Sequence, residues 1–258
     1  MQSRWQSGYT REAPPLPPPP PTTICIIKTF IYLFIFSDSL LAPCKIEDEA
    51  CVRNSVNAAV PTILKGIPEL GVETSDPLFL EKIEGKLSIL EYTFYNTTII
   101  GYFLSKIKYD DEVSPDLASV HYVLNCAGFK MSGLYDISGR LIILPVEGNG
   151  NYLLTTGQYK IEVASDLKVH TGSDGKTYLS IKNFKLKCKA LTPIVFDFKN
   201  LFNGQKDLSD AVHKFANENW PEVAELVQDP TFYACMNKIT RNVNKYLKTV
   251  PLDDYKLN

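Results

Sequence analysis

The hydrophobic and polar positions change their spacing twice along the chain. In Cys51–Leu64 apolar residues recur at three- and four-residue intervals, which predicts an amphipathic helix. In Phe79–Lys189 the period shortens, and runs rich in Ile, Val, Tyr and Phe predict strands. After Leu191 the helical spacing returns. The order of helix, strands and helices predicts an α+β fold, with helices packed on one side of an antiparallel sheet.

Turn-forming residues divide the central region into strands. Gly148–Asn151 and Gly172–Gly175 have the composition of hairpin turns. They separate three predicted antiparallel strands, Leu134–Val146, Tyr152–Val169 and Thr177–Cys188. Several of these are longer than the usual strand of about five or six residues, so we expect a long and strongly curved sheet.

Three helices are predicted outside the strands. Pro61 is expected to kink or end the first helix, and Pro221 to interrupt the second. Asp229 is the expected cap of the last helix, Pro230–Leu247, which would span about 27 Å at the usual helical rise. The apolar stripes are Val52, Val56, Ala59, Val60, Ile63 and Leu64 in the first helix, Leu208, Val212, Phe215 and Ala216 in the second, and Phe232, Cys235, Met236, Ile239, Val243 and Leu247 in the last.

The N-terminal part of the chain differs from the rest. Residues 1–21 are polar and then proline-rich, which fits polyproline II or disorder but not a core, and we interpret them as an extension before the true start. Residues 22–39 hold a lysine, a short apolar run and small residues before a cleavage site after Ser39, the layout of a secretory signal peptide. Ala42 offers a second site. We therefore expect export of a single domain, residues 40–258.

Composition limits the classes of function. The 258-residue chain is 45% hydrophobic and 22% charged, which excludes wholesale disorder. Its net charge of −2, with no long basic run, argues against a nucleic-acid binder, which needs a cationic surface. Six cysteines and three histidines leave little material for a metal site, and no cofactor is expected.

The cysteines are consistent with an oxidising compartment. Cys44 and Cys51 would close a small loop, which we expect to be bridged. Lysines alternate with apolar residues before Cys188, so this thiol faces inward, as does Cys235 on the last helical stripe. A Cys188–Cys235 bridge is therefore geometrically possible and would leave Cys126 as a free buried thiol. Other pairings among these three stay open.

The sequence contains no recognisable catalytic motif. Nucleophile-elbow, phosphate-loop, dinucleotide-binding and zinc-helix patterns are all absent, and the three histidines are isolated in sequence. Lys185, Lys187 and Lys189 form a basic stripe, which an exposed sheet face kept soluble by charge explains. Asn96 begins the only N-glycosylation sequon, which has a meaning only in a secreted protein.

Four blocks of the sequence resemble the insect haemolymph juvenile-hormone-binding and takeout family. Cys44–Leu78 is similar to its N-terminal signature of two cysteines, a helix and KGIPELG. Ser132–Tyr152 is similar to its central hairpin, and Phe196–Trp220 to its NLFNG block and following helix. The terminal VPLDDY, Val250–Tyr255, also fits. The blocks cover nearly all of Cys44–Asn258 in order.

This resemblance implies a long helix wrapped by a highly curved antiparallel sheet, the lipid-binding super-roll. It also implies a cavity for an elongated apolar ligand such as a sesquiterpenoid hormone, and the Cys44–Cys51 bridge. A second, strand-to-helix bridge is associated with the hormone-binding branch, which Cys188 and Cys235 favour. We expect a secreted carrier in haemolymph or another extracellular fluid, without stable membrane insertion after signal cleavage. The alternatives are a secreted protein that presents a lipid to an unknown receptor and, less favoured, an esterase.

Candidate ligand contacts come from the inner sheet face and the last helix. Tyr135 and Tyr159 are candidates for contact with a polar head group, because each combines an apolar body with a hydroxyl. The apolar candidates are Ile137, Ile143, Ile161, Val163, Phe184, Leu186, Phe232, Met236 and Ile239.

Overall fold

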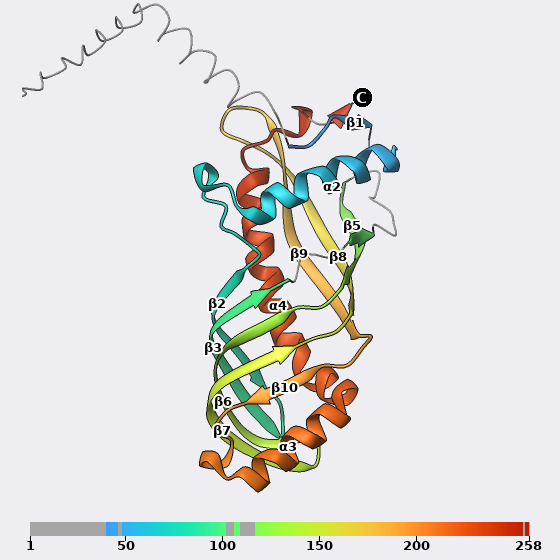
Figure 1. The fold of residues 1–258 in the computed structure, drawn as a ribbon. Helices are drawn as coiled ribbons and strands as arrows, with labels where there is room; N and C mark the ends of the chain where they lie inside the picture. The colour runs from blue at the N-terminus through green and yellow to red at the C-terminus, as the bar shows by residue number, and fades with distance from the viewer. Residues whose placement is uncertain (1–39, 46–47, 102–105, 109–116, 255, 258) are drawn as a thin grey trace, which may run out of the picture. The chain divides into compact units, whose positions relative to one another are not determined.

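Figure 1 shows the computed structural model, which describes residues 40–45, 48–101, 106–108, 117–254 and 256–257. Contacts along the chain divide it into Met1–Asp38 and Ser39–Asn258. The predicted leader and signal segment lie outside the described residues. All the elements described below belong to the second unit.

In the described residues of this unit, two antiparallel sheets and three α-helices make up most of the structure. The helices are α2 (Glu49–Lys65), α3 (Lys206–Glu218) and α4 (Trp220–Leu247). The first sheet has the order β10-β7-β6-β3-β2, from β2 (Leu78–Lys86), β3 (Leu90–Ile100), β6 (Lys130–Leu141), β7 (Leu144–Thr155) and β10 (Val195–Phe198). The second has the order β4-β5-β8-β9, from β4 (Lys106–Lys108), β5 (Ser119–Cys126), β8 (Tyr159–Thr171) and β9 (Thr177–Ala190). The short elements are β1 (Cys44–Lys45), which pairs in parallel with β11 (Lys256–Leu257), and the 3-10 helices η1 (Pro68–Leu70), η2 (Phe202–Gly204) and η3 (Leu252–Asp254).

The predicted α+β class with a long C-terminal helix against a large antiparallel sheet is confirmed. Helix α4 runs along the strands and packs against β9 of one sheet and β2 of the other (Figure 1). Helix α2 crosses one end of α4, and α3 lies at the opposite end (Figure 1). The main core lies between α4 and the inner faces of the sheets, and a smaller apolar cluster lies where α2 meets the C-terminal end of α4.

Helix α4 begins ten residues before the predicted start at Pro230. Asp229 does not cap it, because the helix continues through Pro230 from Trp220, with Pro221 in its first turn. A proline inside a helix deprives a preceding carbonyl of its N–H donor. In this structure the Tyr92 hydroxyl of β3 donates to the Val227 carbonyl at 2.7 Å. This bond lies next to the Leu226 carbonyl, which is the one that Pro230 leaves without an N–H donor, and the helix would be about 42 Å long at the usual rise.

The first predicted hairpin turn is also corrected. Leu141 pairs with Leu144, so the chain reverses at Ile142 and Ile143, while Gly148 and Gly150 lie inside β7. The reason for these glycines is close backbone contact. An added Cβ would lie 2.9 Å from the Cα of Leu201 at Gly148, and 2.6 Å from the Lys199 carbonyl oxygen at Gly150. The Gly-rich pattern therefore marks a strand crossed closely by residues 199–201.

Two predicted strands therefore have wrong bounds, because Leu134–Val146 contains the β6–β7 turn and Tyr152–Val169 joins the end of β7 to β8. The predictions for the second hairpin and for the first two helices agree with the structure. The turn at Gly172–Gly175 joins β8 to β9, with Thr171 paired to Thr177. The first predicted helix is α2, and Pro61 lies within it without ending it. The Leu208–Ala216 stripe lies on α3.

Candidate functional site

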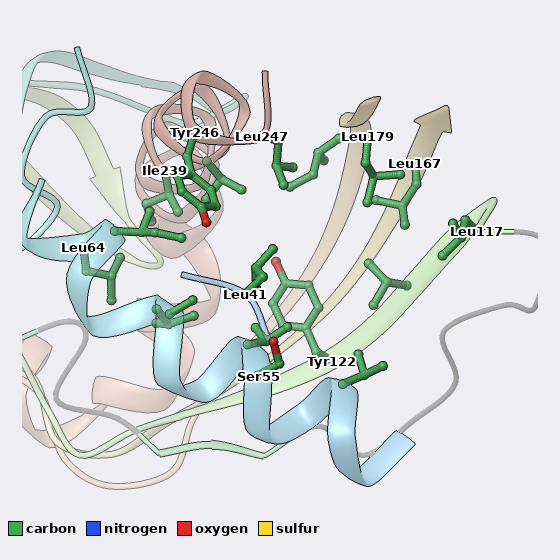
Figure 2. A pocket seen from close by; sticks show the side chains of 18 of the residues that line it. Leu41, Ser55, Leu64, Leu117, Tyr122, Leu167, Leu179, Ile239, Tyr246 and Leu247 are labelled. Carbon is green, nitrogen blue, oxygen red and sulfur yellow. The ribbon is translucent and has the colours of Figure 1, made fainter. Parts of the chain in front are cut away.

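The end of the fold where α2 crosses α4 contains a cavity of about 320 Å³ (Figure 2). Its walls are α2, the C-terminal half of α4 and the inner faces of β5, β8 and β9. The apolar stripe predicted for the first helix supplies six of the lining residues: Val52, Val56, Ala59, Val60, Ile63 and Leu64. The sequence therefore identified this wall as an apolar helix face without indicating that the face borders a cavity.

The opposite walls are also apolar. Strand β5 contributes Val120 and Leu124 on either side of Tyr122, and β8 and β9 contribute Leu167, Leu179 and Ile181. Helix α4 contributes Met236, Ile239, Val243, Tyr246 and Leu247. Among the described residues of the lining, none is Asp, Glu, Lys, Arg or His. The cavity thus suits an uncharged apolar molecule.

Three hydroxyl groups are the side-chain polar groups of the lining. The Ser55 hydroxyl donates to the Ala42 carbonyl at 3.1 Å, and the Leu40 N–H donates to the Tyr246 hydroxyl at 3.1 Å. Figure 2 shows the hydroxyls of Tyr122 and Tyr246 directed into the space between α2 and the strands. Burial raises the pKa of Tyr122 to about 12, although a hydrogen bond with the Ser165 side chain opposes the shift. The Tyr122 hydroxyl therefore remains protonated at any physiological pH.

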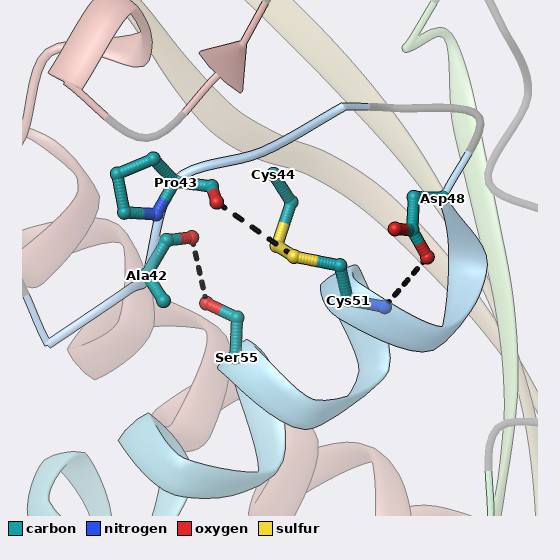
Figure 3. The surroundings of a disulfide bond; sticks show 6 residues. All are labelled: Ala42, Pro43, Cys44, Asp48, Cys51 and Ser55. Carbon is teal, nitrogen blue, oxygen red and sulfur yellow. Dashed lines mark hydrogen bonds between the residues drawn. A yellow bond between two sulfur atoms is a disulfide. The ribbon is translucent and has the colours of Figure 1, made fainter.

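Residues 40–45 cover part of the cavity. Leu41, Ala42 and Cys44 belong to its lining. A disulfide joins Cys44 to Cys51 on α2, as predicted (Figure 3). Asp48 begins the helix beside it, because its carboxylate accepts from the Cys51 N–H at 3.0 Å. The disulfide thus ties the covering segment to the helix that forms one wall.

Of the predicted ligand contacts, Met236 and Ile239 line this cavity. The other predicted contacts belong to the packed core, except one. That exception is Ile143, which is corrected: its side chain is 62% exposed because it occupies the β6–β7 turn. The core group comprises Tyr135, Ile137, Tyr159, Ile161, Val163, Phe184, Leu186 and Phe232.

Aromatic rings fill the core around Tyr135. The rings of Tyr135 and Phe198 lie 4.7 Å apart, and those of Phe94 and Tyr152 lie 4.5 Å apart. The Tyr135 hydroxyl donates to the Lys199 carbonyl at 2.8 Å. Side-chain volume therefore fills this part of the interior, in contrast to the region bordered by α2.

The predicted Cys188–Cys235 bridge is absent, and both residues are free thiols. The sequence placed both cysteines in the same interior correctly. A disulfide requires in addition a narrow range of Cα separations and Cβ directions, which an inward-facing pattern does not fix. Burial raises the pKa of Cys188 to about 12 and also raises that of Cys235. These thiols, like the buried Cys126, lie outside the Cys44–Cys51 disulfide and behave as apolar core groups.

Asn96 is exposed on β3, at an irregularity in its pairing with β6. Its glycosylation stays a prediction. Within the described residues, no helix is both long and apolar enough to cross a membrane. In the same part of the chain, no three His, Cys, Asp or Glu side chains gather as metal ligands.

Comparison with known proteins places this architecture in a family. The family described as haemolymph juvenile hormone binding protein (JHBP) matches residues 24–256. The chain belongs to this family. The crystal structure of Takeout 1 from Epiphyas postvittana superposes with a TM-score of 0.78 at 27% identity, covering 84% of this chain and 100% of that one. The resemblance inferred from the four sequence blocks is confirmed, together with the fold that it implied.

Two curated relatives cover most of the chain. The circadian clock-controlled protein daywake of Drosophila melanogaster is 27% identical over 228 residues, which are 84% of this chain and 87% of daywake. The putative beta-carotene-binding protein of Schistocerca gregaria is 24% identical over 178 residues, 67% of this chain and 70% of that protein.

Proposed function

We propose that the protein is an extracellular carrier that holds one elongated, uncharged apolar molecule in the cavity between α2, α4 and strands β5, β8 and β9. The observation that carries this proposal is the lining itself, in which every described side chain is apolar or bears a hydroxyl group. Transfer of apolar surface from water stabilises such a complex by about 25 cal/mol per Å². The part of the lining that the structure describes holds no nucleophile with an adjacent base, so we propose binding and release instead of hydrolysis.

The ligand class follows from the absence of a cation. A carboxylate placed in this cavity would lose its hydration without gaining a charged partner, which is costly. An ester, ether, ketone or alcohol loses less hydration free energy on entering the cavity and can accept one hydrogen bond there. Terpenoids and other neutral lipids meet this description, and the names of the family and of the Schistocerca gregaria relative support it.

Several observations support an extracellular location. The Cys44–Cys51 disulfide is of a kind that persists in oxidising compartments. Asn96 is exposed, as a glycan acceptor must be. Together with the predicted signal segment, these features support secretion into a body fluid.

The test compares two ligands that differ only in charge. A long-chain methyl ester and its free acid, at pH 7.5, compete for the protein against a neutral fluorescent probe. We expect the ester to displace the probe at a concentration at least ten-fold lower than the acid. Mass spectrometry of a solvent extract of secreted protein should release a neutral lipid. Equal or tighter binding of the acid would contradict the proposal.

A further inference from the structure

The outer face of the sheet that borders the cavity carries a concentration of positive charge. The β8–β9 hairpin, Tyr159–Ala190, contains seven lysines and three acidic residues, a net charge of +4, whereas the whole chain carries −2. Charge is therefore segregated onto this hairpin. Solubility alone does not require such segregation, since interspersed charges serve it equally well.

Strand pairing places the lysines in a compact array. Lys185, Lys187 and Lys189 alternate with inward-facing residues on β9, so they share the outer face. Lys160 of β8 pairs with Lys189 across the ladder. Alternate residues on a strand lie about 6.7 Å apart, so the three β9 lysines extend over about 13 Å. The result is a row of ammonium groups with regular spacing.

A groove runs across this basic face. It is shallow, has a volume of about 410 Å³ and is bordered by Lys160, Lys185 and Lys187. Ala164 of β8 pairs with His121 of β5 on one side and with Lys185 of β9 on the other. Its small side chain leaves room for the groove between these two longer side chains. A groove accommodates a linear chain, whereas docking to a membrane favours a flat or protruding surface with apolar groups that insert.

One carboxylate interrupts the positive lining. Glu162 lies 2.8 Å from the Lys160 ammonium, and its pKa is lowered by Lys160 and, more weakly, by Lys187. With three lysines bordering it, the groove keeps a net positive charge. Lysine ammonium groups act as point charges and impose no bidentate geometry. The lysines therefore favour a bound molecule that carries several negative charges.

We propose that this groove binds a linear sulfated polysaccharide, with sulfate groups placed against Lys160, Lys185, Lys187 and Lys189. Such chains are extracellular, in agreement with the location proposed above, but the groove lies on the opposite face of the sheet from the cavity. The two proposals therefore fail independently. An attached polysaccharide would hold a loaded carrier at a cell or matrix surface.

The probe is a heparin octasaccharide, whose binding to the full mature protein is measured by calorimetry at 50 and 200 mM NaCl. We expect Lys185→Glu/Lys187→Glu to weaken binding at least ten-fold. The matched control Lys130→Glu/Lys248→Glu changes two exposed lysines on other elements and should alter affinity less than two-fold. Glu162→Gln should strengthen binding two- to three-fold.

The salt dependence provides a second readout. Release of counterions by three or four ammonium contacts gives a slope of log affinity against log salt of about −2 to −3. The double variant should lose most of this slope while its melting temperature and its uptake of the neutral probe stay unchanged. Absence of binding at 50 mM NaCl, an equal loss in the control variant, or binding to phosphatidylserine vesicles that the octasaccharide does not displace would overturn the proposal.

Discussion

The side-chain amide of Asn244 on α4 pairs with both polar backbone groups of Ile181 on β9. Its Oδ1 accepts from the Ile181 N–H at 2.8 Å, and its Nδ2 donates to the Ile181 carbonyl at 2.9 Å. In an antiparallel strand the N–H and C=O of one residue point to the same side. Because β9 is at the edge of its sheet, Asn244 takes the place of a neighbouring strand for this residue.

We expect Asn244→Leu to destabilise the protein by about 1–3 kcal/mol, because both backbone groups of Ile181 lose their partner in a partly buried position. Chemical denaturation measures this loss. Asn237→Leu, at an exposed position of the same helix, should change the free energy of unfolding by less than about 0.5 kcal/mol. Equal effects of the two substitutions would show that the amide pair contributes nothing specific.

Met236 lines the cavity, whereas Ile161 is fully buried in the packed core. Met236→Trp should therefore leave the melting temperature of the ligand-free protein nearly unchanged and weaken ligand uptake at least ten-fold, because the indole can occupy ligand space. Ile161→Trp should instead overpack the core and destabilise by about 1–3 kcal/mol. Thermal unfolding and probe binding separate the two. A large loss of stability in Met236→Trp with binding intact would place the ligand elsewhere.

Tyr122 is the hydroxyl that we expect to contact the oxygen of a bound ligand. Tyr122→Phe should lower the affinity for a long-chain methyl ester about five- to ten-fold, the typical value of one hydrogen bond. Affinity for a hydrocarbon of the same length should not change. Tyr233→Phe, at an exposed position on α4, is the control. Equal losses for ester and hydrocarbon would mean that the hydroxyl acts through packing alone.

The buried tyrosines and thiols predict alkaline unfolding. Burial raises the pKa of Tyr122 and Tyr135 from 10.0 to about 12, and that of Cys188 from 9.0 to about 12. A folded-state pKa above the unfolded value means that stability is complete below the unfolded pKa and is lost as pH rises through the folded one. The melting temperature should be constant from about pH 7 to 8 and fall as the pH rises from about 9 to 12, first through Cys188 and then through the tyrosines. A melting temperature that stays constant to pH 12 would contradict this.

The number of cysteines outside the Cys44–Cys51 disulfide can be checked directly. With residues 1–39 removed, Cys126, Cys188 and Cys235 should react with a disulfide reagent slowly at pH 8 and completely after denaturation, giving three thiols. A count of one after denaturation would show that two of these three cysteines are bridged, and peptide mapping without reduction would test whether they are Cys188 and Cys235.

The sequence predicted the fold well because periodicity and the four family blocks report local pairing and packing. The sequence alone does not show whether a glycine lies in a turn or at a strand position where another backbone segment passes closely. Gly148 and Gly150 fit a turn by composition, and only the approach of residues 199–201, distant in sequence, shows that they are strand positions. Similarly, the donor from Tyr92 that accompanies Pro230 inside α4 comes from β3, far along the chain.

The cavity was predicted less well than the fold, for a physical reason. Periodicity identifies which side chains face the interior. By this criterion Phe232 and Tyr246 on α4 are equivalent, since both are buried. Whether the interior is filled at each level depends on the volumes of side chains from other elements. Around Phe232 the rings of Phe129 and Tyr159 fill the space, while around Tyr246 the smaller residues of α2 leave it open. No single segment carries that information.

If the predicted signal peptide is removed, the hydrogen bond from Leu40 to Tyr246 makes the position of the cut important for the proposed binding site. A cut after Ser39 turns the Leu40 nitrogen, 3.1 Å from the tyrosine oxygen, into an ammonium group at the edge of an otherwise uncharged chamber. A cut after Ala42 removes Leu41 from the wall and leaves Ser55 without the carbonyl to which it donates. The two predicted cleavage sites would therefore give cavities with different walls, and recombinant protein should begin at the residue that the secreted protein has.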